Sequence, residues 1–303
     1  MGRRISVFNV LMACAAVGLV PHAAVATDAS RPAVETKKAI EPPARVVPLA
    51  APSGPAAGQA TKRSPLLRFA TPRDSTECKV KSPAYEGRAP LRAVRRAILQ
   101  NRPVRVIALG SSSTVGVGAS SPRATYPIRL ENDLEGVIEG LKVEMYARGQ
   151  SGEVAEGAAE RLKIDVAEIR PDLVVWQVGT NDAVARIDAE TFGSLLRDTL
   201  AWLASHKIDV VLIDPQYVER LAQDARYTSI VNEISKIASE KRVLLVNRFD
   251  AMADLARQHP GSSYLSNDRF HLNDLGYRCM AEYATRAIVA GIIQADTENG
   301  AMH

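Results

Sequence analysis

Short apolar segments alternate with amphipathic helical patterns from residue 78 onwards, and this alternation constrains the fold more than any other feature of the chain. Strand-like runs are expected at 104–109, 141–146, 173–178, 209–213 and 243–246. Helical patterns lie between and after them, at 126–134, 154–169, 189–206, 227–241 and 275–293. The run at 173–178 is apolar at successive positions, as in a strand that is covered on both faces. This spacing predicts an α/β fold in which a five-stranded parallel sheet carries helices on both faces.

The first 26 residues have the pattern of an export signal. Arg3 and Arg4 form a positively charged segment, a short apolar run follows, and positions 24–26 read Ala-Val-Ala, a small-x-small cleavage site. The apolar run is shorter than the roughly 20 residues that a membrane-spanning helix needs, which disfavours a membrane anchor. We therefore expect residues 1–26 to be a signal peptide cleaved after Ala26, and the mature protein to be periplasmic or secreted without a stable membrane span.

The next segment, residues 27–77, is rich in Pro and Ala and shows no hydrophobic periodicity. Such a composition cannot bury a core, so it predicts a disordered linker. The linker can act as a spacer between an envelope surface and a folded domain, or it can be a connection without a selected role. The folded domain is then expected at 78–295, followed by a flexible tail at 296–303.

The net charge of +4 belongs to the N-terminal extension. Residues 1–77 contain ten Lys and Arg and five Asp and Glu, which leaves 28 basic and 29 acidic residues for the remainder. The folded part is therefore nearly neutral and has no basic stripe that would bind a nucleic acid. Its sequence contains no His/Cys cluster with metal-ligand spacing, and Gly116-Val117-Gly118 lacks the third glycine of a dinucleotide fingerprint. These observations give no reason to expect a metal or an organic cofactor.

Two cysteines, Cys78 and Cys279, remain after signal cleavage. In an oxidising compartment they can form a disulfide that ties the first residues of the domain to its last helix. The alternative is two separate buried thiols.

Polar or backbone-exposing positions follow three of the expected strands. Ser112 follows the first strand, Gly149 follows the second, and Asn181 follows the third. Reactive groups collect at the carboxyl ends of the strands in an open parallel sheet. We therefore expect these three positions to converge on one crevice.

A serine in this crevice is the candidate nucleophile. Gly110 and Gly116 permit the sharp strand-to-helix turn that a nucleophilic serine between them requires. Ser112 is the proposed nucleophile, but Ser111 and Ser113 lie in the same turn and compete with it, and the turn alone does not choose among the three. A serine hydroxyl is a weak nucleophile until a base removes its proton, so the site also needs a base.

His271 is the candidate base. It is the only histidine of the expected domain with a carboxylate, Asp268, three residues upstream. At this spacing Asp268 can fold back on the imidazole, select its tautomer and stabilise the imidazolium that proton transfer creates.

Three groups are candidate donors to an oxyanion. A tetrahedral intermediate develops negative charge on the former carbonyl oxygen, and donors aimed at that oxygen lower the barrier. The expected donors are the backbone N–H groups of Ser112 and Gly149 and the side-chain amide of Asn181, with Asp182 bracing the Asn181 loop. Each motif alone is a common turn or helix cap, but their joint order and their placement at strand ends favour a catalytic site.

Together, these motifs resemble the conserved blocks of the SGNH (GDSL-like) hydrolases over about residues 104–290. The first block lies at 106–116, the second contains Gly149, the third is Val-Gly-Thr-Asn-Asp at 178–182, and the fifth is Asp-Arg-Phe-His-Leu-Asn at 268–273. Two positions depart from the family pattern. Ser111 stands where the family commonly has the Asp of Gly-Asp-Ser, and Ala147 stands where it often has Asn.

The resemblance implies a flavodoxin-like three-layer α/β/α sandwich and ester hydrolysis through an acyl-enzyme, without a metal or an organic cofactor. It implies a triad of Ser112, Asp268 and His271 and an oxyanion hole formed by Ser112, Gly149 and Asn181.

We therefore expect an exported serine esterase that hydrolyses an O-acyl ester. The export signal and the polar loop at 216–228 favour acetyl groups on an envelope or extracellular glycan as its substrate. Two alternatives fit the same residues. One is an acyl- or glycosyltransferase on the same scaffold, and the other is a non-catalytic glycan-binding module.

Overall fold

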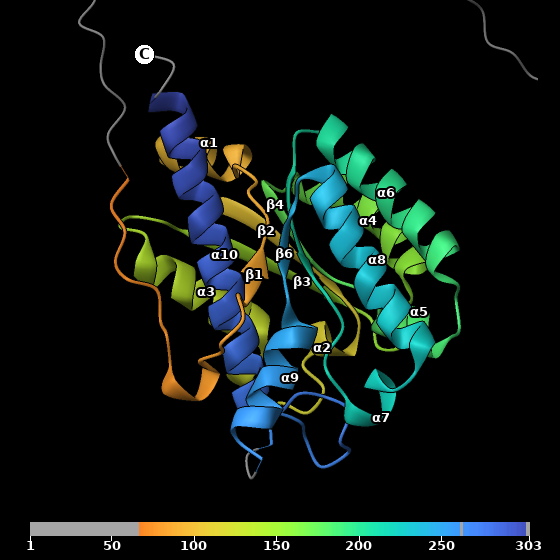
Figure 1. The fold of residues 1–303 in the computed structure, drawn as a ribbon. Coiled ribbons are helices and arrows are strands. Elements are labelled where there is room, and N and C mark those ends of the chain that lie inside the picture. The colour runs from red at the N-terminus through yellow and green to blue at the C-terminus, as the bar shows by residue number, and fades with distance from the viewer. Residues whose placement is uncertain (1–66, 261–262, 301–303) are drawn as a thin grey trace, which may run out of the picture. The chain divides into compact units, whose positions relative to one another are not determined.

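The computed structural model describes residues 67–260 and 263–300. The predicted signal peptide and residues 27–66 of the predicted linker lie outside the described residues. Six strands form one sheet between two layers of helices (Figure 1). The strands are β1 (Tyr85–Glu86), β2 (Val104–Gly110), β3 (Val143–Gly149), β4 (Leu173–Gln177), β5 (Asp209–Ile213) and β6 (Leu244–Val246).

Helices cover both faces of this sheet (Figure 1). One layer contains α1 (Arg92–Leu99), α3 (Tyr126–Val137) and α10 (Asp274–Gly300). The other layer contains α4 (Ala155–Ile169), α6 (Ala189–Ser205) and α8 (Ala225–Lys241). The remaining helices are α2 (Ser112–Val115), α5 (Thr180–Val184), α7 (Glu219–Ala222) and α9 (Arg248–Gln258), with short 3-10 turns η1 (Thr76–Cys78) and η2 (Pro122–Ala124).

The sheet has the topology that the resemblance implies. Its order is β1-β6-β5-β4-β2-β3, and the strands from β2 to β6 run parallel. The five parallel strands therefore follow the order of a flavodoxin-like sheet, with β2 between β3 and β4. The predicted fold class is confirmed, but the predicted strand count is wrong by one. The sixth strand, β1, pairs antiparallel with β6 and has only two residues, which is too short to produce an alternating pattern.

Successive side chains of each strand point to opposite faces of the sheet and build a core on each side of it. In β2, Val106 and Ala108 pack into the core shared with α3 and α10, whereas Ile107 and Leu109 pack into the core shared with α4. All four side chains are fully buried. Because both faces of β2 are covered, its sequence reads as a continuous apolar run.

The five expected helices correspond to α3, α4, α6, α8 and α10. The folded domain extends further at both ends than the predicted range of 78–295. Phe69 forms a β-bridge with Ile138, and the Ser75 N–H donates to Glu282 Oε2 over 3.1 Å. Residues from 67 onwards therefore pack on the domain instead of belonging to the linker. At the other end, α10 continues to Gly300, past the expected domain end at residue 295.

Cys78 and Cys279 form a disulfide, with their Cα atoms 5.0 Å apart. Of the two arrangements that the sequence allows, the structure has the disulfide and not two separate thiols. The bond connects η1 to α10 across a sequence separation of 201 residues. Next to it, the Tyr264 hydroxyl donates to the Glu77 carbonyl over 2.9 Å, so the linked region also holds the segment that leads to His271.

No helix in the part of the chain that the structure describes combines the length and the apolar character that crossing a bilayer would require.

Candidate active site

The carboxyl ends of three neighbouring strands bring the candidate residues together. Because β2 pairs with both β3 and β4, its carboxyl end lies at the switch point where open α/β sheets bind their ligands. Ser112 begins α2 just after β2, Gly149 is the last residue of β3, and Asn181 lies in the first turn of α5 after β4.

Ser112, His271 and Asp268 form a continuous chain of polar contacts. The Nε2 atom of His271 lies 3.0 Å from Ser112 Oγ, and its Nδ1 atom lies 2.6 Å from Asp268 Oδ2. Ser112 and His271 are 159 residues apart in the sequence, so this contact depends on the fold. A hydroxyl, an imidazole and a carboxylate in this order can move a proton away from the serine oxygen.

The Asp268 carboxylate is held by its own turn. Its Oδ1 atom accepts hydrogen bonds from the Ser266 hydroxyl and from the backbone N–H groups of Phe270 and His271, over 2.7, 2.9 and 3.0 Å. Desolvation acts to raise the pKa of Asp268, but these hydrogen bonds and the one from the His271 ring together lower it well below its usual range. The carboxylate therefore stays ionised beside His271.

The turn that carries Ser112 requires glycine on the facing strand. Ser111 is the N-cap of α2, and Gly116 ends the helix in the left-handed region at φ +94°. A Cβ atom on Gly149 would lie 2.5 Å from the backbone nitrogen of Val115, because α2 packs directly on the end of β3. Only glycine allows the end of β3 to approach the helix that carries Ser112 this closely.

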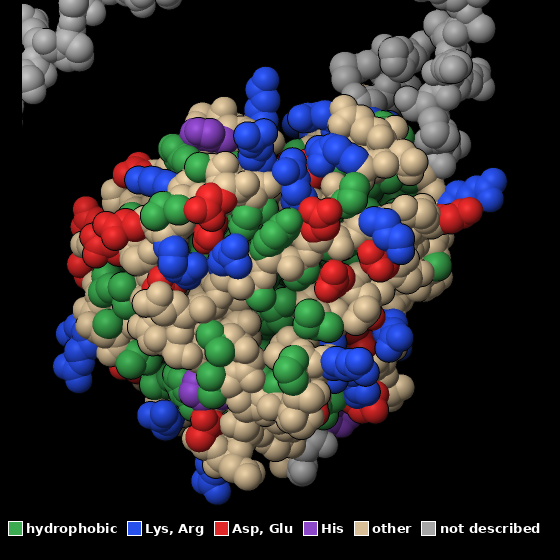
Figure 2. All heavy atoms as spheres, turned by 180° about the vertical axis from the view of Figure 1, so that it is seen from behind, with side chains coloured by type: hydrophobic (Ala, Val, Ile, Leu, Met, Phe, Trp, Pro, Cys, Tyr) green, Lys and Arg blue, Asp and Glu red, His purple; other side chains and the backbone are tan. Residues whose placement is uncertain are grey.

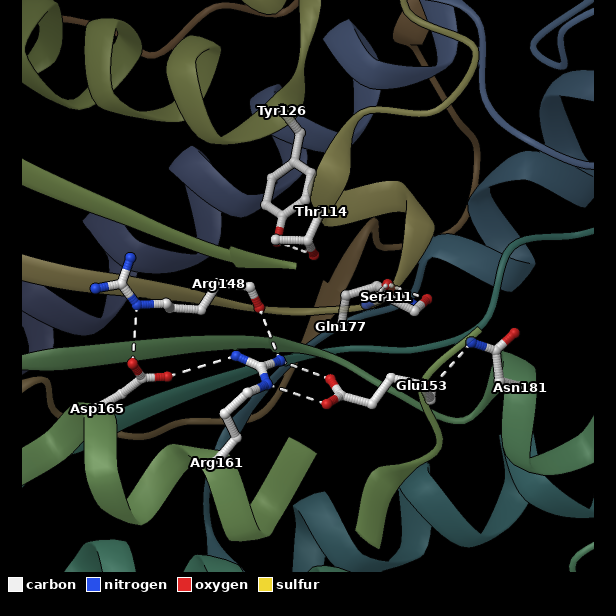
Figure 3. Close-up of polar contacts among 9 residues, drawn as sticks. All are labelled: Ser111, Thr114, Tyr126, Arg148, Glu153, Arg161, Asp165, Gln177 and Asn181. Carbon is white, nitrogen blue, oxygen red and sulfur yellow. Dashed lines mark hydrogen bonds and ion pairs between the residues drawn. The ribbon is translucent and has the colours of Figure 1, made fainter. Parts of the chain in front are cut away.

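Asn181 is fixed by a backbone carbonyl of the neighbouring loop. Its Nδ2 atom donates to the Glu153 carbonyl over 2.8 Å (Figure 3). An amide nitrogen carries two hydrogens, so the second one remains for an oxyanion.

The carboxylate of Asp182 accepts a hydrogen bond from the Ala155 N–H over 2.9 Å and thereby joins α5 to the start of α4. Burial raises the pKa of this carboxyl.

Arg161 connects the two parts of the donor side (Figure 3). Its Nε and Nη2 atoms bind the Glu153 carboxylate over 3.0 and 2.6 Å. The same Nη2 atom donates to the Arg148 carbonyl over 3.2 Å. The Arg148 carbonyl and the Gly149 N–H belong to one peptide group, so this bond fixes the orientation of a candidate oxyanion donor. Asp165, which binds both Arg148 and Arg161, completes the network.

Two polar contacts of the site were not expected from the sequence. The Ser111 N–H and hydroxyl both lie 3.2 Å from Oε1 of Gln177, the last residue of β4. Ser111 thus uses an amide oxygen of the adjacent strand at the position where the SGNH pattern commonly has Asp. A buried Gln at the end of an otherwise apolar strand is the signal that would have identified Gln177. Nothing in the local sequence marks the Glu153–Arg161 pair.

Cavities lie at both ends of the sheet. One of about 760 Å³ lies at the amino end, beside Lys207 and Asp209, far from Ser112. Lys and Arg side chains gather at this end of the molecule, which is the upper end in Figure 2. A smaller pocket of about 330 Å³ includes Phe270, next to His271.

In the described residues, no group of three or more His, Cys, Asp and Glu side chains is arranged to hold a metal ion.

Known proteins with the same fold include several esterases. A protein of the G-D-S-L family from Desulfitobacterium hafniense DCB-2 is 23% identical over 61% of this chain and 99% of its own, with a TM-score of 0.51. The acetyl xylan esterase AlAXEase is 26% identical over 61% of this chain and 100% of its own, with a TM-score of 0.52. A two-domain esterase active on acetylated mannans is 17% identical over 71% of this chain and 57% of its own, with a TM-score of 0.58.

No curated protein matches the chain. The sequence profile of the non-GDSL lipase-like family, in contrast, matches residues 77–294, which include every residue of the candidate site. The chain therefore belongs to the non-GDSL lipase-like family and is an ester-bond hydrolase.

Proposed function

We propose that the protein is an exported serine esterase that removes O-acyl groups, principally acetyl groups, from a glycan. The observation that carries this proposal is the contact of His271 with Ser112 on one side and with Asp268 on the other, over 3.0 and 2.6 Å. An acetyl xylan esterase and an esterase active on acetylated mannans share the fold, which supports acetylated glycans as the substrate class.

In the first half of the reaction, Ser112 Oγ attacks the carbonyl carbon of the ester. The Nε2 atom of His271 accepts the hydroxyl proton, and Asp268 binds the Nδ1–H of the resulting imidazolium. The carbonyl π electrons move to the oxygen. When the tetrahedral intermediate collapses, the bond to the alcohol oxygen breaks, and the alcohol leaves with the proton from His271. The acyl group remains on Ser112.

In the second half, water replaces the alcohol. His271 takes a proton from the water as it attacks the acyl carbon, and then returns the proton to Ser112 Oγ as the acyl–oxygen bond breaks. The carboxylic acid leaves and the enzyme is regenerated.

The negative charge of both intermediates is stabilised by the donor side of the site. The N–H groups of Ser112 and Gly149 and the free Nδ2 hydrogen of Asn181 form the oxyanion hole in this proposal. Each donor of this kind contributes about 10²–10³ in rate. Arg161 and Glu153 hold two of the three donors before the substrate arrives, which supports a site built for this purpose.

Export is the part of the proposal that depends on the sequence alone. The signal pattern at residues 1–26 predicts a mature chain that begins at Thr27. N-terminal sequencing of the protein secreted by an expressing bacterium tests this, and a full-length cytoplasmic protein would contradict it.

Turnover of p-nitrophenyl acetate by the purified protein tests the catalytic assignment. Ser112→Ala and His271→Ala should each lower kcat/KM by about 10⁴-fold. Ser113→Ala and His206→Ala are matched controls, since one is a buried serine in the same helix and the other an exposed histidine at the end of α6, and both should retain activity. Equal rates for all five proteins would reject the assignment. Acetate release from acetylated xylan and mannan tests the glycan part.

A further inference from the structure

The 330 Å³ pocket lies between two elements that also carry the candidate site. One wall comes from α5, which contains Asn181, and the other includes Phe270, which precedes His271. Its lining includes Val184, Arg186, Arg220, Leu221, Asp224 and Phe270. Because α5 and Phe270 adjoin both the pocket and the candidate site, the alcohol part of an ester bound at Ser112 can extend into the pocket.

Phe270 connects the imidazole to a cationic side chain. The Phe270 and His271 rings meet edge to face, with their centroids 4.9 Å apart. The guanidinium carbon of Arg220 lies 5.9 Å from the Phe270 centroid. These two distances place the Arg220 charge within about 11 Å of the His271 ring. A sugar ring with its acylated oxygen at Ser112 reaches this distance without an additional unit.

Apolar side chains are exposed at the mouth of the site. Val184 in the pocket is 54% exposed, and Val115 on α2 is 51% exposed. Two of the four exposed large hydrophobic residues in the described part of the chain therefore flank Ser112 and Asn181. Exposed apolar side chains that gather at one place indicate a binding surface, and with Leu221 and Phe270 they offer contacts for the apolar faces of a sugar ring.

The pocket has two guanidinium groups that are not neutralised by direct contact. Within residues 67–260 and 263–300, neither Arg186 nor Arg220 forms an ion pair or a side-chain hydrogen bond. One carboxylate, that of Asp224, also lines the pocket. Its Oδ1 atom accepts from the Arg226 N–H over 2.8 Å and caps α8, so part of its hydrogen-bonding capacity is committed to the helix.

We propose that this pocket binds the alcohol part of the ester and selects one with an anionic group beside the acylated oxygen. This inference rests on the proposed function. Guanidinium groups bind carboxylates and phosphates through paired, charge-assisted hydrogen bonds. The substrate class is therefore an O-acetylated acidic sugar, in which the ring contacts Phe270 and Val184 while its carboxylate or phosphate binds Arg220 and Arg186.

The experiment compares three methyl glycosides that share one acetylated ring. They are an O-acetyl glucoside, the matching O-acetyl glucuronide, and the O-acetyl glucoside 6-phosphate. We expect the enzyme to prefer the anionic esters by about tenfold or more in kcat/KM, because hydrogen bonds to charged groups are stronger than neutral ones. The glucuronide and the phosphate arms separate the two kinds of anion. Added salt should reduce the preference, since charges near the surface are screened.

Three substitutions locate the preference. Arg220→Gln and Arg186→Gln should each lower the ratio of anionic to neutral kcat/KM towards one. Arg226→Gln is the matched control, because it removes the same charge from an exposed residue beside the pocket that does not line it, and it should leave the ratio unchanged. The inference would be overturned if neither pocket substitution changed the ratio of anionic to neutral kcat/KM. It would also be overturned if the wild type showed no preference for the anionic esters.

The failure of this inference is distinguishable from the failure of the proposed function. Turnover of p-nitrophenyl acetate that depends on Ser112, without any preference for anionic sugars, would overturn only the inference. Loss of the Ser112 dependence would overturn the proposed function itself, and the inference with it.

Discussion

The two sides of the candidate site are held in different ways. On the acid–base side, Asp268 and His271 lie on one turn, with side chains that are 47% and 19% exposed. On the donor side, Glu153 lies in the loop between β3 and α4 and Arg161 lies on α4, with side chains that are 6% and 26% exposed. The first side depends on contacts between near neighbours in the sequence, and the second on ion pairs that join separate elements.

This difference corresponds to what each side has to do in the proposed mechanism. A base must pick up and release a proton, so its imidazole needs one correct orientation and access to solvent. Oxyanion donors act only if they are already aimed at the oxygen when its charge develops, which requires a rigid support. For the proposed donors Gly149 and Asn181, such support comes from outside the donors themselves, from Arg161 and Glu153.

The largest expected effect comes from breaking the acid–base side. Asp268→Asn keeps the shape of the side chain, but an amide nitrogen facing His271 Nδ1 selects the wrong tautomer. We expect kcat/KM for an acetyl ester to fall by about 10³–10⁴-fold, with little change in thermal stability because Asp268 is half exposed. Steady-state kinetics and a melting curve for the same preparation check both parts.

Asp188→Asn is the matched control for this prediction. Asp188 is also an exposed carboxylate that accepts from a backbone N–H and from a hydroxyl, both of Thr191, but it caps α6. This variant should keep the wild-type rate. An Asp268→Asn enzyme of similar activity to the control would mean that His271 does not depend on Asp268.

The acid–base side was also the easier side to predict from the sequence. Asp268 and His271 are three residues apart, so one turn explains their contact without knowledge of the fold. Position after an apolar strand left Ser111, Ser112 and Ser113 as candidates, and the resemblance to the SGNH pattern selected Ser112. The strand–helix alternation predicted the parallel sheet. These inferences use signals that lie within a few residues or repeat along the chain.

The support of the donor side could not be read in this way. Whether Arg161 reaches both Glu153 and the Arg148 carbonyl depends on the path of the loop after β3 and on the rotation of α4 about its axis. The contact between Ser111 and Gln177 depends on the pairing of β2 with β4. The two-residue strand β1 left no pattern at all.

A smaller effect is expected from breaking the support of the donor side. Arg161→Met keeps the aliphatic stem but removes the bonds to the Glu153 carboxylate and the Arg148 carbonyl. We expect kcat to fall by about 10–10²-fold with little change in KM, because the donors remain present but are less well aimed. The pH profile should not change, since Arg161 does not contact the Ser112–His271–Asp268 chain.

Arg197→Met separates positioning from general destabilisation. Arg197 is 27% exposed and, like Arg161, bridges two carboxylates, those of Glu233 and Glu240, but it lies between α6 and α8. This variant should lose stability without losing kcat at temperatures where it is folded. If both arginine variants lost kcat equally, Arg161 would have only a structural role.

The smallest effect concerns the pH dependence of stability on the acid–base side. The pKa of Asp268 is lowered in the folded protein, so its carboxylate contributes stability above about pH 4, where an unfolded Asp is ionised, and this contribution is lost as the pH falls. For a half-exposed group the contribution is about 1 kcal/mol or less. Urea unfolding of the wild type and of Asp268→Asn between pH 3 and about pH 5 measures it as the difference between the two free energies of unfolding, in which titrating groups that do not contact Asp268 cancel. The difference should shrink as the pH falls below about 4. A difference that grew in acid would mean that the folded state binds the proton more tightly, and the turn around Asp268 would then not hold an ionised carboxylate.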